Sequence, residues 1–474
     1  MGALHDLWHG VVTARRRRRF AWTSCLTVAL GIGAATTVFA VVDGVLLRPL
    51  PYPQADQIVS IREMRGTQFA GRTPPGRLED WRQANRTLSA IGGWYSGSLS
   101  GLVGANPVRI ISAVVSPGFF EVAGVAPARG RTLAADEERA GGPAAAVISA
   151  SLARRLSLEP GAVIGAEGVA YTVVGVMPHT FAVPSRSTEI WLPKQARPAL
   201  IGIRRARNYN VVARVREGVT LRQAAADLGA IQQQLGAQYP DTDAGLTLDV
   251  SAFKGRVVGT AADRIWPIFA AACLILLVTC VNVGCLLVAA MPERRTEFGA
   301  RLALGATRGM LVRQLLGEST TYALVGGVAG AALAAVTLPL LRQALPDVPR
   351  IDEVRWYGTT TLAVAAQVAI AALTFAAFPA ARLRSVTLYA AARTAVSGGM
   401  PRGLVVAQLA LATVLVMAAI AFTQTFRQLQ GVPLGFDPAD VLTLRVSASA
   451  ESDSPSKPRS ATPKRSRRWR ACRA

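Results

Sequence analysis

The sequence predicts a multi-pass α-helical membrane protein with a large extracytoplasmic domain of mixed α/β (α+β) structure. Three observations predict this class. The 474 residues are 51% hydrophobic and 17% charged, which is too apolar for an ordinary soluble protein and too polar for a fully embedded one. The apolar residues form long runs, and arginines gather at the ends of those runs. A segment of about 220 residues between the first two runs, long enough for at least one domain, shows interleaved strand and helix patterns.

Five apolar runs are long enough to cross a bilayer core of about 30 Å as helices, which takes roughly 20 residues. We expect these spans at 20–42, 264–290, 319–341, 359–381 and 403–425. Runs of this length with almost no charge argue against the alternative of buried helices in a large soluble core. The first run is longer than the apolar region of a signal peptide and has no small-residue cleavage site, so we expect it to remain attached.

Arginines near the span ends predict the orientation, because cytoplasmic loops carry an excess of Lys and Arg. Arg15–Arg19 precede the first span, and the loops after the second and fourth spans are also arginine-rich. Residues 1–19 and 291–318 are therefore expected in the cytoplasm, and residues 43–263 outside. The formal net charge of +23 would also suit a nucleic-acid binder. Since topology already explains most of these arginines, we expect contact with membrane lipid and no nucleic-acid partner.

The outside segment is expected to form one large or two small domains of mixed strands and helices. The predicted strands are 57–63, 108–115, 145–149, 171–177 and 211–215, and the predicted helices are 75–85 and 221–238, the second capped by Thr220. This segment contains no cysteine, so it folds without disulfides. Four of the five cysteines lie in spans, where they act most simply as small packing residues. No zinc-type spacing occurs, and we expect no metal site.

The loop at 291–318 is predicted to form two short helices that are broken at Gly305. Glu297 and Arg301 form a favourable i,i+4 pair, Gly305 suits a left-handed position at the end of a helix, and Thr307 can cap the next helix. Such an amphipathic element can present a charged face to a partner protein, or it can be a solvated loop that only enforces topology. Nearby, Gly326 and Gly330 in the third span and Gly33 in the first suit close helix packing, within the chain or between two copies.

Several kinds of chemistry are missing from the sequence. It has no G-x-x-x-x-G-K-[ST] phosphate loop, no H-E-x-x-H and no G-x-S-x-G, and its three histidines are scattered. The span interiors hold no acidic residue, since Asp43 and Glu318 fall at span ends, so a proton-driven carrier is not expected. We expect no catalytic residue, no bound cofactor and no enzyme activity of the chain itself.

The chain contains an internal echo. Residues 51–62 after the first span and 435–446 after the fifth share an aromatic, a proline, Ala-Asp and then an alternating strand, so 426–446 are interpreted as the start of a second outside domain. Residues 447–474 are rich in Ser, Pro, Ala and Arg, and we expect them to be disordered. The abrupt change favours a shifted frame or a truncated gene, and a genuine basic tail is the alternative.

Residues 294–320, RRTEFGARLALGATRGMLVRQLLGEST, resemble the signature of FtsX-type permeases, with a permease domain at about 266–385. The segments 42–61, 115–133, 171–184 and 189–193 resemble the periplasmic core domain of MacB-like ABC transporter permeases. The resemblance covers about 20–446. The duplicated layout is similar to long permeases that have two such halves and no attached ATPase, and we expect this chain to be truncated after the first half.

This resemblance implies a function in mechanotransmission. A separate ABC ATPase subunit, which binds the ATP, would grip the cytoplasmic loop, and the spans would relay its closure to the outside domain for export or extraction of an amphiphilic substrate across a bacterial inner membrane. A second permease copy and a periplasmic adaptor or outer-membrane protein are the further implied partners. Alternatives are a signalling or scaffold protein that regulates a periplasmic partner such as a cell-wall hydrolase, and a non-functional fragment. The implied coupling surface is Arg294, Arg295, Glu297, Arg301, Gly305, Ala306 and Thr307.

Overall fold

Two units make up the chain in the computed structural model. One unit comprises Met1–Arg48 with Val258–Asp440, and the other Pro49–Val257 with Val441–Ala474. The structure describes residues 18–103, 106–139, 141–166, 168–193, 204–290, 300–301, 304–305, 307–345, 348–383 and 402–430. We call the first the helical unit and the second the sheet unit.

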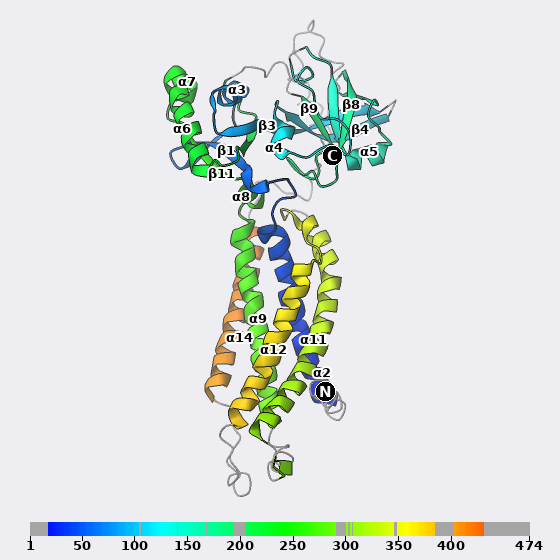
Figure 1. The fold of residues 1–474 in the computed structure, drawn as a ribbon, viewed down its shortest axis with the longest axis vertical. Helices are drawn as coiled ribbons and strands as arrows, with labels where there is room; N and C mark the ends of the chain where they lie inside the picture. Colours follow the sequence, from blue (N-terminus) through cyan, green and yellow to red (C-terminus); the bar gives the residue numbers. More distant parts are fainter. Residues whose placement is uncertain are drawn as a thin grey trace, which may run out of the picture. The chain divides into compact units, whose positions relative to one another are not determined.

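The helical unit is built from long apolar helices (Figure 1). They are α2 (Arg18–Val41), α9 (Ala261–Ala289), α11 (Arg308–Ala344), α12 (Gly358–Leu383) and α14 (Arg402–Gln430). A π-helix, η1 (Val42–Leu47), continues α2, and a 3₁₀ turn, η6 (Ile351–Glu353), precedes α12. These apolar runs of Ala, Leu and Val form helices because the bilayer core offers no water to the backbone. A helix satisfies its backbone N–H and C=O groups with its own hydrogen bonds.

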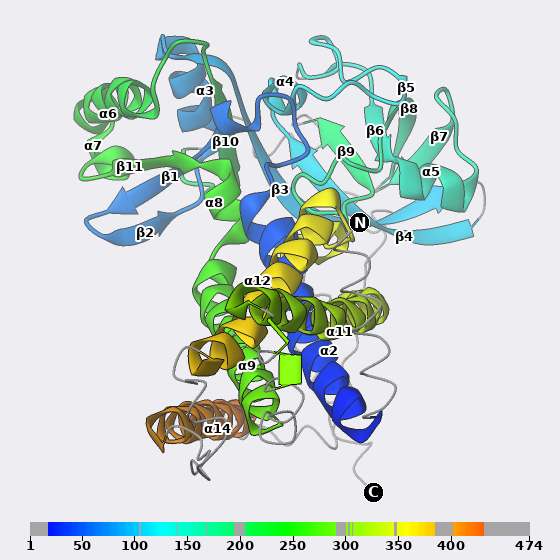
Figure 2. The same ribbon diagram turned by 60° about the horizontal axis from the view of Figure 1, so that its bottom comes forward.

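Four of these helices, among the described residues, are long and apolar enough to cross a membrane: Phe20–Leu47, Ala261–Ala289, Gly309–Ala344 and Gly358–Ala377. They correspond to the first four expected spans. The fifth expected span lies within α14, where the apolar stretch Gln408–Ala421 is shorter, so its crossing of the bilayer stays a prediction. In the bundle α11 packs against α2 and α12, while α9 packs against α2 and α12 and borders α14 (Figures 1 and 2).

An 11-stranded mixed sheet forms the sheet unit, in the order β11-β1-β10-β3-β4-β9-β6-β8-β5, with β2 beside β1 and β7 beside β3 and β8. Its strands are β1 (Ile58–Arg65), β2 (Gln68–Gly71), β3 (Leu88–Val103), β4 (Asn106–Val115), β5 (Arg129–Gly130), β6 (Ala145–Ser149), β7 (Val163–Ala166), β8 (Val169–Met177), β9 (Ile190–Pro193), β10 (Asn210–Val215) and β11 (Thr247–Ala252). The pairs β4–β9 and β6–β8 are parallel, and the other strand pairs are antiparallel.

Short helices cover the sheet: α3 (Pro75–Ala84), α4 (Phe119–Ala123), α5 (Ala150–Leu156), α6 (Leu221–Gln238), α7 (Pro240–Asp243) and α8 (Phe253–Val258), with a 3₁₀ turn, η2 (Ala55–Gln57). One apolar cluster packs α3 and α6 on β1 and β10, and another packs α5 on β6 and β8. A third cluster takes the alternate residues of the same strands, on the opposite face of the sheet, and in it the rings of Phe120, Phe181 and Trp191 contact one another. The long pair β3–β4 joins the two halves, so one continuous sheet resolves the choice between one domain and two.

The five strands and two helices expected from the sequence are all present with shifts of at most a few residues at their ends. Thr220 caps α6 as expected, and the cap is a reciprocal box with Gln223. The 16-residue strand β3 was not expected. Its sequence, LSAIGGWYSGSLSGLV, contains four glycines and four serines, a composition that reads as a loop.

Candidate functional site

The loop that the sequence marks as a coupling surface is described in part. Arg294, Arg295, Glu297 and Ala306 lie outside the described residues. Gly305 has a φ of +94°, in the left-handed region that favours glycine. Thr307 caps α11, its Oγ1 accepting a hydrogen bond from the Met310 backbone N–H at 3.4 Å.

The helix after this cap differs from the expected short element. It is α11, which runs without interruption from Arg308 to Ala344. The expected boundary near Ser319 followed a change in hydropathy, but nothing there ends a helix, because neither Gly nor Pro interrupts Glu318–Thr321. Glu318 therefore lies within a continuous helix. It lies buried, well inside the candidate span Gly309–Ala344.

Arg301 connects the segment before Gly305 to this helix. Its Nη1 donates a hydrogen bond to Oε1 of Gln314, in the second turn of α11. The contact ties a residue on one side of the Gly305 turn to the helix on the other side. Arg301 is therefore a residue that positions the loop as well as a charge on it.

The three glycines expected to pack helices lie together, between α2 and α11, and we call Gly33, Gly326 and Gly330 the glycine seam. A Cβ added at Gly330 would lie 2.9 Å from the Ala29 carbonyl oxygen and 3.0 Å from the Gly33 backbone nitrogen. A Cβ at Gly326 would lie 2.6 Å from Val28 Cβ. Only glycine allows the two backbones to approach this closely. Within this chain, then, the glycines pack one helix on another.

Contacts on either side of the glycine seam show that α2 and α11 run parallel in a constant register. Phe20 meets Tyr322 edge to face near the beginning of α2, and the hydroxyls of Thr37 and Thr337 are 2.9 Å apart near its end. The two helices are thus in contact over most of the length of α2, which makes them suited to move as one body.

The end of α2 is held by polar contacts that hydropathy did not reveal. Asp43, expected at a span end, is buried in the π-helix η1 and lies inside the candidate span Phe20–Leu47. Its Oδ2 accepts hydrogen bonds from Arg48 Nε at 3.0 Å and from Thr359 Oγ1 at 2.7 Å. The Arg48 guanidinium lies 3.2 Å from the centre of the Tyr357 ring, a cation–π geometry.

Arg350 holds the same segment from the loop between α11 and α12. Its Nη1 donates to the carbonyl oxygens of Val45 and Arg48, at 3.2 and 3.0 Å, and its Nη2 pairs with Glu353 Oε2 at 2.6 Å. Arg350 is buried and has a φ of +60°, which a side chain adopts at a cost unless its surroundings hold it there. We call the set Asp43, Arg48, Arg350, Glu353, Tyr357 and Thr359 the exit clamp.

The sequence carried only a weak signal for the exit clamp. Residues 342–355 mix arginines with acidic residues, and Arg350 and Glu353 have the i,i+3 spacing of an ion pair. The π-helix has no sequence signature, yet π-bulges are frequent at functional sites.

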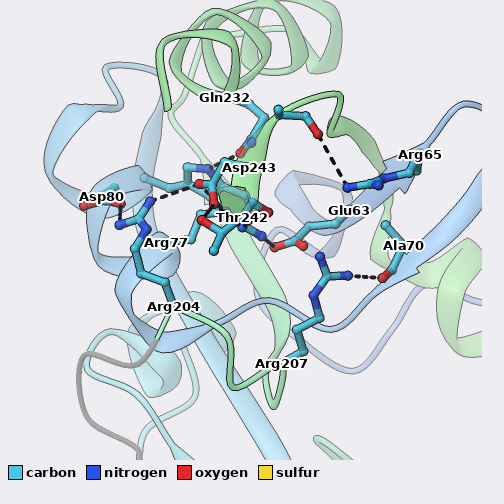
Figure 3. Close-up of polar contacts among 12 residues, drawn as sticks. Glu63, Arg65, Ala70, Arg77, Asp80, Arg204, Arg207, Gln232, Thr242 and Asp243 are labelled. Carbon is cyan, nitrogen blue, oxygen red and sulfur yellow. Dashed lines mark hydrogen bonds and ion pairs between the residues drawn. The ribbon is translucent and has the colours of Figure 1, made fainter. Parts of the chain in front are cut away.

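A second buried polar cluster lies in the sheet unit, between β1, α3 and α7 (Figure 3). Arg77, with 0% of its surface exposed, pairs through Nη1 with Glu63 Oε1 at 2.5 Å and through Nη2 with Asp243 Oδ1 at 2.5 Å. Arg204 bridges Asp243, at 2.9 Å, and Asp80, at 2.6 Å. The cluster joins segments up to 180 positions apart, between Glu63 and Asp243, and no local pattern predicts it.

The environment of this cluster separates its two carboxyl groups. Burial raises the pKa of Glu63 above its ordinary value, although the neighbouring Arg77 opposes the shift. Burial acts on Asp243 too, but hydrogen bonds from Arg77, Thr242 and Arg204 outweigh it and hold the pKa of Asp243 below its ordinary value. The arrangement suits a structural role, holding β1, α3 and α7 together, rather than proton transfer, because each charge is neutralised by a fixed neighbour.

Among the described residues, no group of three or more His, Cys, Asp or Glu side chains could hold a metal ion. In the helical unit the Gly305 turn precedes α11, the exit clamp follows α2, and the glycine seam joins these two helices.

Comparison with known families adds to this geometry. The chain matches the model of the MacB-like periplasmic core domain over residues 21–231 and that of the FtsX-like permease C-terminal domain over residues 269–390. It is 29% identical over 237 residues to "Macrolide export ATP-binding/permease protein MacB" of Shewanella sp. (strain W3-18-1), a match that covers 49% of this chain and 36% of that protein.

A second relative, "Probable export ATP-binding/permease protein MacB" of Pseudomonas entomophila (strain L48), is 25% identical over 343 residues, covering 69% of this chain and 49% of the relative. The chain thus spans about half or less of the length of these curated relatives. The periplasmic region of MacB from Actinobacillus actinomycetemcomitans aligns with a TM-score of 0.34 at 13% identity, covering 44% of this chain and 94% of that structure.

The two family matches follow one another along the chain: the first begins in α2 and ends in α6, and the second begins in α9 and ends after α12. The first describes a periplasmic domain and the second a membrane permease. The chain therefore belongs to the MacB/FtsX family of ABC-type transporter permeases, membrane proteins with a periplasmic domain.

Proposed function

We propose that this permease converts ATP hydrolysis by a separate ATPase subunit into movement of its sheet unit, for export or extraction of an amphiphilic substrate. The membrane is a bacterial inner membrane, with the N-terminus and residues 291–307 in the cytoplasm. The observation that carries the proposal is the continuity of α11, which joins the Gly305 turn to the helix bundle without a break.

The length of α11 supports this role. Its 37 residues correspond to about 55 Å at 1.5 Å per residue, whereas the bilayer core is about 30 Å thick. The helix is therefore long enough to extend well beyond the hydrocarbon. A rigid rod of this kind transmits a push at its capped end, near Thr307 and Arg301, to the membrane interior.

The glycine seam passes that movement to α2. Because the backbones of the two helices touch at Gly330 and Gly33, α11 cannot shift without displacing α2 or opening the seam. At its far end α2 passes into η1, which the exit clamp holds against the loop before α12. The polypeptide then continues directly from Arg48 to Pro49, where the sheet unit begins. A displacement of α2 is thus delivered to the covalent connection of the sheet unit.

The partners follow from the family. An ABC-type permease of this kind works with an ATPase, and the sequence has no phosphate loop of its own, so we assign ATP binding to the partner and neither cofactor nor catalysis to this chain. A second permease copy and a periplasmic adaptor or outer-membrane protein complete the proposed assembly.

The test uses the full chain in lipid vesicles with the ATPase that co-purifies with it. ATP hydrolysis reports coupling at the Gly305 turn, and hydrogen exchange of residues 49–257 in the presence of ATP and vanadate reports movement of the sheet unit. Arg301→Glu should abolish both signals, because it reverses the charge that holds the loop on α11. Arg350→Gln should leave stimulation of the ATPase largely intact and abolish the exchange response.

Arg427→Glu, at the end of α14, is the matched control and should change neither signal. Undiminished ATPase stimulation by Arg301→Glu would contradict the docking role. An unchanged exchange response in Arg350→Gln would contradict transmission through the exit clamp. A full exchange response without movement of any amphiphile would instead favour the signalling function.

A further inference from the structure

The four candidate spans are longer than a membrane crossing needs. They contain 28, 29, 36 and 20 residues, whereas about 20 helical residues cross a bilayer core of about 30 Å. Two of them also contain a buried carboxylate, Asp43 in the first and Glu318 in the third, and a carboxylate is costly in hydrocarbon. The contacts between the helices narrow the crossing.

Contacts between α2 and α9 show which of their residues lie at the same level. The rings of Phe39 and Phe269 are 6.4 Å apart, and a Cβ added at Gly31 would lie 2.7 Å from Thr279 Oγ1. Because residue numbers rise in one helix as they fall in the other, the two helices are antiparallel. Trp266, one turn before Phe269, is therefore level with the end of α2.

The beginning of α12 lies at this level too. Thr359 Oγ1 donates a hydrogen bond to Asp43 Oδ2 at 2.7 Å, whereas Phe375, further along α12, packs in the apolar cluster around the first half of α2. Trp356 Nε1 donates a hydrogen bond to Thr361 Oγ1 at 2.9 Å. This bond holds the Trp356 ring beside the first turn of α12, level with the end of α2.

Two tryptophans and two arginines thus mark one level of the helical unit. Trp266 and Trp356 are 49% and 39% exposed, although tryptophan is largely buried on average. Arg264 and Arg355, beside them in the chain, are exposed and make no hydrogen bond or ion pair with residues that the structure describes. Exposed tryptophans and arginines are typical anchors at the boundary between hydrocarbon and headgroups. We call these four residues the interfacial belt.

The opposite boundary lies near the beginning of α2. Trp22 is 75% exposed there, and the neighbouring Phe20 meets Tyr322 of α11 edge to face. The stretch 22–41 of α2 is about 30 Å long at 1.5 Å per residue, which equals the thickness of a bilayer core. The exposed tryptophans at the two ends are therefore one membrane thickness apart.

The other helices agree with these two levels. Stretches of the same length at the same levels contain no Asp, Glu, Lys or Arg, and neither does 22–41; they are 266–285 in α9, 322–341 in α11 and 361–380 in α12. Asp43 falls just beyond the stretch in α2. Glu318 falls before the stretch in α11, by about 6 Å at 1.5 Å per residue. Both buried carboxylates therefore lie at the edges of the crossing.

We propose that the interfacial belt binds the headgroup layer of a phospholipid bilayer, and that the hydrocarbon core extends from this belt to Trp22. The guanidinium groups of the belt pair with lipid phosphates, and its indole rings occupy the layer just beneath them. The exit clamp then lies outside the hydrocarbon, where the charge of Asp43 costs less than it does in the core.

The test is quenching of tryptophan fluorescence in the full chain, reconstituted without any ATPase into phosphatidylcholine vesicles. One probe lipid carries a nitroxide on its headgroup, and the other carries a nitroxide near the end of an acyl chain. The emission that Trp266→Phe combined with Trp356→Phe removes is the signal of the interfacial belt. The headgroup probe should quench this signal more strongly than the acyl-chain probe, because the two rings lie at the interface.

Leu30→Trp is the matched control. Leu30 is 55% exposed on α2, and it lies about 12 Å along the helix from Trp22 at 1.5 Å per residue, well inside the proposed core. The emission that this variant adds should be quenched more strongly by the acyl-chain probe. The same preference in the two signals overturns the proposal, as does stronger quenching of the belt signal by the acyl-chain probe or a lack of quenching by either probe.

Arg264→Leu combined with Arg355→Leu tests the guanidinium groups. Without their contacts to phosphate the belt should lie deeper, so the ratio of quenching by the headgroup probe to quenching by the acyl-chain probe should fall for the total emission. Arg222→Leu, at an exposed position of α6 in the sheet unit, should leave this ratio unchanged. Equal ratios in the two variants would overturn phosphate binding by the belt. Because no ATP hydrolysis is involved, such a failure leaves the proposed coupling function untouched.

Discussion

Placing a methyl group in the glycine seam tests whether α2 and α11 are in backbone contact. In Gly326→Ala the new Cβ would lie 2.6 Å from both Cβ and Cγ1 of Val28 and 3.2 Å from the Cys25 carbonyl oxygen. Carbon atoms prefer a separation of about 3.5–4.0 Å, so the helices must separate by roughly 1 Å. Overpacking of this kind costs about 1–3 kcal/mol, whereas the gain in helix propensity is about 1 kcal/mol.

The matched control is Gly309→Ala in the same helix. Its Cβ would meet only Thr307 Oγ1, at 3.8 Å, an ordinary contact, so it should be neutral or slightly stabilising. Unfolding is followed by circular dichroism during titration of dodecyl-maltoside micelles with SDS. The free energy of unfolding of Gly326→Ala should fall below that of Gly309→Ala by roughly 1–3 kcal/mol, and the additional change Val28→Ala should restore part of the loss. Equal stability of the two alanine variants would refute close backbone contact between α2 and α11 at the glycine seam.

Three further predictions concern the sheet unit. Arg77→Met should lower the free energy of unfolding by about 3–5 kcal/mol, because Glu63 loses its cation and Asp243 keeps only Arg204. In chemical denaturation Arg139→Met, at an exposed position, should lower the free energy of unfolding by less than about 0.5 kcal/mol. Similar losses in the two variants would contradict a structural role of the buried cluster. Burial, followed by the charge of Glu121, raises the pKa of Glu138 from 4.5 to about 7. Its stabilising contribution is therefore complete below about pH 4.5 and is lost as pH rises to about 7, and Glu138→Gln should remove this slope from a pH series of melting curves. Thr220→Ala removes the capping box of α6 and should cost about 1 kcal/mol, read from the same melting curves; an unchanged melting temperature would show that the cap is redundant.

The predictions from sequence succeeded where the signal is local. Short apolar runs located β6 and β8, and Thr220 marked the residue before α6. They were wrong about the second helix of the loop at 291–318, which is not short but is the beginning of the continuous helix α11. The strand β3 was missed, although neighbouring strands pair with it on both sides.

The candidate site likewise contains residues that local sequence patterns identified and residues that they did not. Gly305 and Thr307 were recognised because a left-handed glycine and a helix cap are properties of a few consecutive residues. The exit clamp was not recognised, because Asp43 and Thr359 are 316 positions apart, and nothing in either neighbourhood of the chain depends on the other.

The amino-acid sequence by itself determined which four segments are long and apolar enough to cross a membrane, five of the eleven strands, and where α6 and α11 begin, since hydropathy and capping act over a few residues. The tertiary structure alone decided that α11 pairs with α2 in parallel, that Asp43 is clamped from the loop before α12, and that Arg77 joins Glu63 to Asp243. These contacts depend on the distances between backbones after packing. Such distances cannot be inferred from residues that are neighbours along the chain.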